Sequence, residues 1–178
     1  MAAVNEIDTS QVATGWMSRL VRAWLLTAVV DAVFSSVLSV AFYHSPASRL
    51  WQGVASTLLG KAALDGGSRT VAIGLLMHFG VAFAWSAVFL ILFEKSARVR
   101  RAVWSEHGVL KVASLYGPFI WIVMSFAVIP LLVHRSPSIT YRWWVQLLGH
   151  IPFVALPIVW SIGRTPRAAH ATISEGRR

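Results

Sequence analysis

The chain has 178 residues, of which 56% are hydrophobic and only 13% are charged, and its mean hydropathy is +0.63. Soluble domains carry about 25% charged residues, so this composition argues against a soluble protein and favours a single domain embedded in lipid. The sequence contains no cysteine, which excludes disulfides, thiolate metal sites and cysteine nucleophiles.

The net charge of +9 would suggest nucleic-acid binding in a soluble protein. Here the basic residues lie at the ends of long apolar segments, where the positive-inside bias of membrane proteins and attraction to anionic lipid account for them. We therefore expect the lipid bilayer, and not nucleic acid, to be the partner of this charge.

The first 15 residues are polar, and Arg19 and Arg22 precede the first apolar span, which predicts a cytoplasmic N-terminal segment over 1–22. The first apolar span then covers 23–43 and is interrupted only by Asp31. A helical pattern over 48–64 follows, but this stretch is too short to cross a bilayer. It predicts a short helix that lies in the membrane interface or re-enters the membrane.

The second span, 71–93, gives the clearest membrane signal. It runs 23 residues without a formal charge, and His78 is its one ionisable side chain. At about 1.5 Å per residue, a helix of this length covers about 34 Å, which exceeds a hydrocarbon core of roughly 30 Å. Third and fourth spans are predicted at 112–133 and 143–163, and a basic cytoplasmic tail at 164–178.

These patterns predict an all-α, polytopic membrane protein with a transmembrane domain over 23–163. Four transmembrane helices form this domain, and the interfacial or re-entrant helix lies between the first and the second. Eleven of the sixteen Lys and Arg residues lie before the first span, between the second and third spans, or after the fourth. The positive-inside bias then places both termini in the cytoplasm.

Polar side chains inside the spans are the candidates for a functional site. Asp31 is the only acidic residue within a span, and an ionised carboxylate at mid-bilayer costs about 2.5–3.5 kcal/mol on insertion scales. We therefore expect it to face the bundle, to be paired, or to be protonated. Ser35 continues a polar stripe on the same helix, while His78 and His150 fall at the same depth on the second and fourth spans. The pattern predicts an intramembrane Asp–His cluster, and Tyr116 in the third span is a further candidate residue of this polar site.

The same residues leave other interpretations open. A buried Asp paired with a His, and a second His bonded to a carbonyl, would also serve simply to fix helix packing. His78 and His150 on facing helices would suit a bis-histidine haem, and together with Asp31 a facial metal set. No spacing motif supports either, so we expect no cofactor, with haem or a metal at His78 and His150 as the alternative.

Four stretches of the sequence resemble a family of small, functionally uncharacterised bacterial inner-membrane proteins. They are VVDAVFSSV around Asp31, LWQGVASTLLGKAALDGG in the first loop, GLLMHFGVAFAW around His78, and SLYGPFIWIVMSFAVIPL in the third span. The resemblance implies four helices in a bacterial inner membrane and no established activity. Ser125 stands where the resemblance leads us to expect an asparagine. The motif residues that it implies are Asp31, Gln52, Gly67, His78, Tyr116, Gly117 and Pro130.

The leading functional hypothesis is a small transport, channel-like or proton-responsive protein in which Asp31 titrates, with His78 and His150 as its partners. The alternatives are a non-catalytic accessory subunit of a larger membrane complex and the haem-binding protein considered above. The sequence contains no nucleophile elbow, phosphate loop or metalloprotease helix, so an enzyme is not the preferred interpretation. A bundle this small often needs a second copy to line a pathway, which makes a homo-oligomer another expected partner.

Overall fold

The computed structural model describes residues 9–134, 136 and 138–164, and all regular structure in these residues is helical. Four helical rods in this part of the chain are long and apolar enough to cross a membrane. The prediction of an all-α fold is therefore confirmed, as is that of four helices with the length and composition needed to cross a membrane. The rods are Gly15–Phe42, Gly67–Lys95, Gly108–Val133 and Tyr141–Gly163.

The first two rods are the longest, and they extend beyond the apolar segments. The first consists of α1 (Thr9–Val37) and a terminal π-helical turn, η1 (Leu38–Phe42). The second is the single helix α3 (Gly67–Lys95). The helices start earlier than the predicted spans because hydropathy marks only the part that suits hydrocarbon, whereas the backbone continues its hydrogen bonding into the interface.

The third and fourth rods each change from α- to π-helix near the middle. In both, the π-helical turn ends two residues before a proline, Pro130 or Pro157, and the residue before each proline donates its N–H to the carbonyl five residues back. Proline has no N–H to donate, so the wider turn takes up the interruption of the α-helical pattern. The segments are α5 (Gly108–Val123), η3 (Met124–Val128), α6 (Ile129–Val133), α7 (Tyr141–His150), η4 (Ile151–Ala155) and α8 (Leu156–Gly163).

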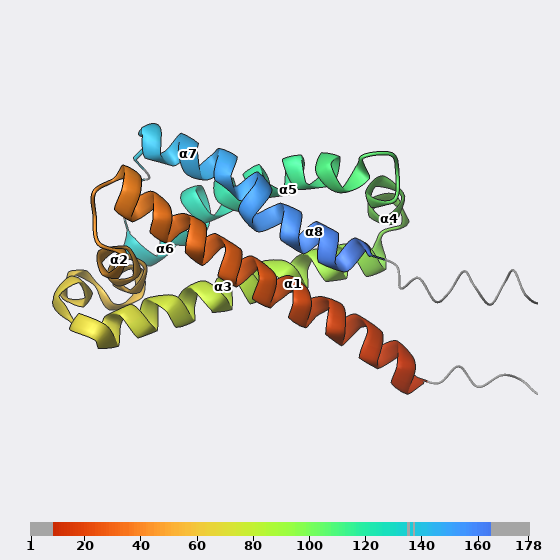
Figure 1. Cartoon of the computed structure of the whole chain (residues 1–178), viewed down its shortest axis with the longest axis horizontal. Helices are drawn as coiled ribbons and strands as arrows, with labels where there is room; N and C mark the ends of the chain where they lie inside the picture. The colour runs from red at the N-terminus through yellow and green to blue at the C-terminus, as the bar shows by residue number, and fades with distance from the viewer. Residues whose placement is uncertain (1–8, 135, 137, 165–178) are drawn as a thin grey trace, which may run out of the picture.

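Short helices lie at the two ends of the bundle (Figure 1). At one end are α2 (Ala47–Leu59) and the 3₁₀ turn η2 (Lys61–Asp65), and at the other is α4 (Ala97–Val103). The helix α2 is seen almost end-on in Figure 1, so its axis runs across the long axis of the bundle. The start of α1 and the end of α8 lie at the same end as α4.

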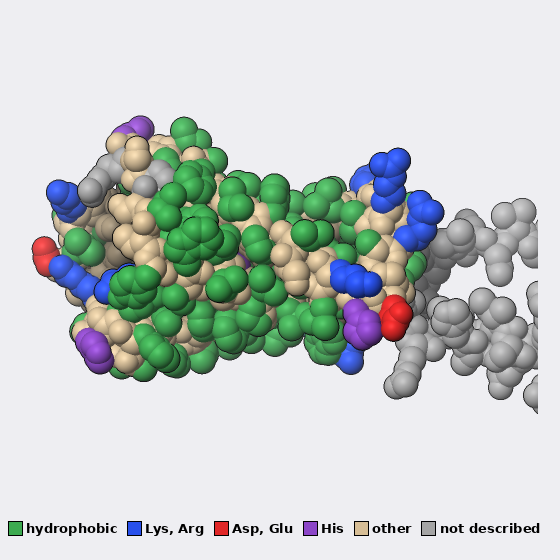
Figure 2. Space-filling view, turned by 90° about the horizontal axis from the view of Figure 1, so that it is seen from above, with side chains coloured by type: hydrophobic (Ala, Val, Ile, Leu, Met, Phe, Trp, Pro, Cys, Tyr) green, Lys and Arg blue, Asp and Glu red, His purple; other side chains and the backbone are tan. Residues whose placement is uncertain are grey.

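The outer surface of the rods is apolar, and the charged side chains gather at the two ends (Figure 2). Leucines on the second and third rods point outward, with Leu76, Leu115 and Leu131 each 74–76% exposed. A soluble monomer rarely exposes so continuous an apolar surface, whereas lipid is its natural solvent. The exposed apolar surface and the four long helices suggest a membrane protein.

Small residues allow α2 to approach α3 closely. A Cβ atom at Gly74 on α3 would collide with the backbone carbonyl of Trp51 on α2, and Ala55 also lies against this point. Gly80, two turns further along α3, has nothing within 4 Å of the same position. The approach at Gly74 fixes α2 against α3 and brings Trp51 next to the middle of the bundle.

Candidate functional site

Asp31 on α1 and His78 on α3 face each other inside the bundle. The Oδ2 atom of Asp31 lies 3.9 Å from Nδ1 of His78, and the two side chains are only 15% and 14% exposed. One turn later on α1, the hydroxyl of Ser35 donates a hydrogen bond of 3.4 Å to Oδ1 of Asp31. The second ring nitrogen of His78, Nε2, lies 3.0 Å from the carbonyl oxygen of Ala28.

The contact with Ala28 determines how this pair holds protons. A carbonyl oxygen only accepts hydrogen bonds, so Nε2 of His78 carries the hydrogen of that bond. In neutral His78 the lone pair of Nδ1 then faces the carboxyl group of Asp31. Two acceptors facing each other repel, so the favourable states place one further proton either on Asp31 or on Nδ1 of His78.

The separation within the pair also sets how a proton moves. At 3.9 Å the two atoms are further apart than in a direct hydrogen bond. A small side-chain rotation or a bridging water is therefore required for transfer. Such a pair is chemically suited to taking up and releasing one proton in response to its surroundings.

His150, at the end of α7, is the second imidazole near Asp31. It is 9% exposed, and its Nδ1 donates a hydrogen bond of 2.7 Å to the carbonyl of Gln146, which leaves Nε2 without a hydrogen in the neutral ring. Within the described residues, Asp31 makes its ion pair with His78, and the hydrogen bond of His150 goes to Gln146 and not to Asp31. Gly117 on α5 makes room for this helix, because a Cβ there would lie 2.7 Å from the carbonyl oxygen of His150.

Aromatic rings cover both imidazoles. Trp51 of α2 lies with its ring centroid 5.2 Å from that of His78, and Trp121 of α5 lies 4.9 Å from His150. Nothing in the sequence signals either contact. These contacts depend on which helices are neighbours, and apolar periodicity does not specify that.

Tyr116, implied as a motif residue by the family resemblance, lies away from Asp31 in the aromatic core between α3 and α5. Its hydroxyl donates a hydrogen bond of 2.8 Å to the carbonyl of Trp85, and its ring centroid is 5.0 Å from that of Phe89. Trp85 is seven residues beyond His78, which is about 10 Å along the helix. The contacts of Tyr116 therefore connect α3 and α5 in the core. None of those given for the described residues reaches the Asp–His cluster.

The two loop-motif residues contact each other. The side-chain amide of Gln52 on α2 donates a hydrogen bond of 3.3 Å to the carbonyl of Gly67, the first residue of α3. Gly67 has φ = +60°, a left-handed conformation that disfavours residues with a Cβ. The pair ties α2 to the start of α3 and so supports the position of Trp51.

Replacing Gly67 with alanine is therefore expected to lower the free energy of unfolding by about 1 kcal/mol, because alanine is strained in the left-handed region. Gly53 on α2 is the matched control, since it is helical and nothing lies within 4 Å of its Cβ position. The measurement is reversible unfolding in mixed detergent micelles. Equal effects of the two substitutions would contradict this account of Gly67.

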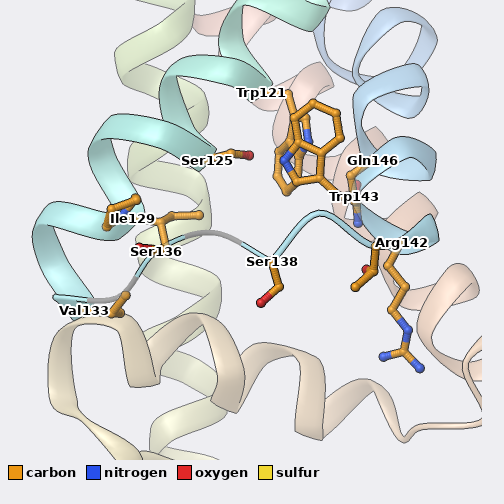
Figure 3. A pocket seen from close by; sticks show the side chains of 11 residues that line it. Trp121, Ser125, Ile129, Val133, Ser136, Ser138, Arg142, Trp143 and Gln146 are labelled. Atoms are coloured by element: carbon orange, nitrogen blue, oxygen red, sulfur yellow. The ribbon is translucent and has the colours of Figure 1, made fainter.

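A cavity of about 440 Å³ adjoins the cluster at the end of the bundle that carries α2 (Figure 3). It lies between the η3–α6 segment and α7, next to His150: Trp121 and Gln146, the two residues that contact the ring of His150, both line it. The apolar pattern of the spans does not predict this cavity, because it arises where η3 interrupts the third rod. Its other side chains include Ser125, Pro130, Arg142 and Trp143.

Metal and haem ligation have no support in this geometry. In the part of the chain that the structure describes, no group of three or more His, Cys, Asp or Glu side chains is placed to hold a metal ion. Both ring nitrogens of His78 already face a partner, Ala28 or Asp31, so haem ligation by His78 would break one of these contacts. A visible spectrum of the purified protein tests for haem directly.

Comparisons with known proteins add no information on the function of this site. No family model matches the chain, and no curated protein and no solved structure is similar to it at a significant level.

Proposed function

We propose that this protein is a small proton-responsive transport or channel-like protein of a bacterial inner membrane, in which Asp31 and His78 exchange a proton inside the bilayer. The proposal rests on the buried pair of Asp31 and His78 on two neighbouring helices. A second imidazole, that of His150, contacts Trp121, which lines the cavity at one end of the bundle. Ionisable groups at this depth are costly to keep in a membrane and commonly mark ion or proton pathways.

The helices around the pair contain elements that allow movement. The π-helical turn η4 begins directly after His150, and η3 lies beside the cavity. Such turns interrupt the regular hydrogen-bond ladder and often occur at functional sites. A change in the charge of the pair would alter the attraction between Asp31 on α1 and His78 on α3.

The charge distribution supports an orientation with both termini in the cytoplasm. Eight of the twelve described Lys and Arg residues lie at the end with α4 and the two termini of the bundle, and the other four lie at the end with α2. By the positive-inside bias, the first end is cytoplasmic. The helix α2, which crosses the long axis of the bundle, is then an interfacial helix on the outer side, with Trp51 directed toward His78.

Proton flux in proteoliposomes tests this function. We expect the wild-type protein to acidify or alkalinise a vesicle interior containing a pH-sensitive dye when a potassium diffusion potential is applied, and Asp31→Asn to reduce the initial rate at least tenfold. Asparagine keeps the size of the side chain but does not exchange a proton. The matched control is Asp65→Asn, which removes an exposed carboxylate outside the spans and should leave the rate unchanged.

Two results would contradict the proposal. Equal rates for wild type and Asp31→Asn would remove Asp31 from the mechanism. Absence of flux, together with a stoichiometric foreign subunit retained through purification in gentle detergent, would instead favour the accessory-subunit hypothesis.

A further inference from the structure

The cavity beside η3 contains polar groups that the proton exchange does not use. Three buried polar atoms of its lining residues have no hydrogen-bond partner within the described part of the chain: Nε1 of Trp121, Oγ of Ser125 and Nε1 of Trp143. An indole N–H can only donate, and a serine hydroxyl can donate. Buried polar groups are nearly always satisfied, so three unsatisfied donors in one wall call for an acceptor.

These three groups come together on the inner side of the cavity. Figure 3 shows the side chain of Ser125 pointing toward the indole rings of Trp121 and Trp143, which lie close to each other. Ser125 is only 4% exposed, so it belongs to the floor of the cavity and not to its rim. The ring centroids of the two tryptophans are 6.3 Å apart, so the two indoles form one side of the same cavity.

The electrostatic surroundings favour a negatively charged acceptor. The cavity is lined by Thr140 and Arg142 at the N-terminal end of α7, where backbone N–H groups give a partial positive charge and no side chain caps the helix. Arg142 adds a full positive charge nearby, with its guanidinium 4.2 Å from the ring of Tyr43 and directed away from the indole groups (Figure 3). None of the described lining residues is an aspartate or a glutamate.

The rest of the cavity lining is largely apolar, which favours a ligand whose negative group is attached to an apolar body. Ile129, Pro130 and Val133 form an apolar wall on the α6 side of the cavity, across from the indole rings (Figure 3). The volume of about 440 Å³ falls within the range of roughly 300–1,000 Å³ typical of small-molecule sites. An inorganic anion alone would leave this wall uncovered, whereas an anion with an apolar body would fill it.

From this arrangement we infer that the cavity binds a small carboxylate with an apolar body. The carboxylate accepts hydrogen bonds from Ser125 and from the indole groups of Trp121 and Trp143, and the apolar body packs on Ile129 and Pro130. This ligand has two sources: a water-soluble organic acid from the outer side, or a fatty acid from the outer leaflet. The inference goes beyond the proposed proton exchange and stands independently of it.

Indole N–H resonances of ¹⁵N-labelled protein in lipid nanodiscs test the inference, with hexanoate added to the water phase or palmitate added to the bilayer as probes. The nine tryptophans give nine indole signals, and those of Trp121 and Trp143 are assigned by single Trp→Phe substitutions. We expect these two signals to shift saturably with one or both probes. Hexanoate binding assigns the site to soluble acids, and a response to palmitate alone assigns it to fatty acids.

Two comparisons separate the carboxylate site from general partitioning into the protein. Ser125→Ala should weaken binding about tenfold, as expected for a lost hydrogen bond to a charged group. Ser105→Ala is the matched control, because the hydroxyl of Ser105 donates to the carbonyl of Ala102 on the opposite end of the bundle. Hexanol, which has the same body and no carboxylate, should not reproduce the shifts.

Three outcomes would overturn the inference. They are no saturable shift with either probe, equal responses to hexanoate and hexanol, and unchanged affinity in both Ser125→Ala and Trp143→Phe. Binding that persists in Asp31→Asn supports the site even if the proton-flux experiment fails, so the two proposals fail separately.

Discussion

Replacing His78 with leucine is expected to destabilise the bundle by about 3 kcal/mol at a pH where Asp31 is ionised. Removing one partner of a buried pair leaves the other charge uncompensated, which costs more than the pair itself contributes. Both side chains of this pair are about 15% exposed or less, so water does little to replace the lost imidazole. The measurement is the free energy of unfolding in mixed micelles.

A second substitution in the same chain isolates the interaction. Adding Asp31→Asn to His78→Leu should restore a large part of the lost stability, because the uncompensated charge is gone, while Asp31→Asn alone should have a smaller effect than His78→Leu. The difference gives the coupling energy of the two residues. Strictly additive effects would show that Asp31 and His78 do not interact.

Gly74→Ala is expected to have the second-largest effect, a loss of about 2 kcal/mol, since overpacking at a close contact typically costs about 1–3 kcal/mol. The added Cβ would collide with the carbonyl of Trp51, so α2 must move away from α3. Gly80→Ala is the matched control on the same helix, and it should be neutral or slightly stabilising, because glycine weakens a helix by about 0.5–1 kcal/mol relative to alanine.

The displacement of α2 can be measured directly. The chain has no cysteine, so spin labels placed at Leu59→Cys and Leu76→Cys, both exposed, report the distance between α2 and α3 without background. Gly74→Ala should lengthen or broaden this distance, and Gly80→Ala should not. An unchanged distance distribution in Gly74→Ala would show that the contact is not as tight as the structure has it.

Hydropathy and charge predict the four spans well, because lipid requires long apolar segments whose backbone is satisfied internally. Asp31 and His78 could be selected from the sequence for the same reason: ionisable groups are rare in such segments. Their partners could not. The bond from His78 to Ala28 and the cover from Trp51 depend on the rotation and neighbours of each helix, which an all-round apolar surface leaves undetermined.

The cavity illustrates the same limit. Prolines at 118, 130 and 157 predict irregularities, yet α5 continues through Pro118 while π-helical turns precede the other two. The sequence alone does not tell which of these prolines follows a π-helical turn and which lies within a continuous α-helix. The convergence of Ser125, Trp121 and Trp143 follows from that local geometry.

The central claim, that Asp31 and His78 exchange a proton within the membrane, is tested most directly by ¹³C NMR of the aspartate carboxyl groups in nanodiscs over a pH range. The chain has only three aspartates, at positions 8, 31 and 65, so the Asp31 signal is identified with a single substitution. We predict that the Asp31 carboxyl changes its protonation state within this pH range, and that His78→Asn moves this transition. An Asp31 signal that stays in one protonation state throughout, or that titrates identically with and without His78, would contradict the account.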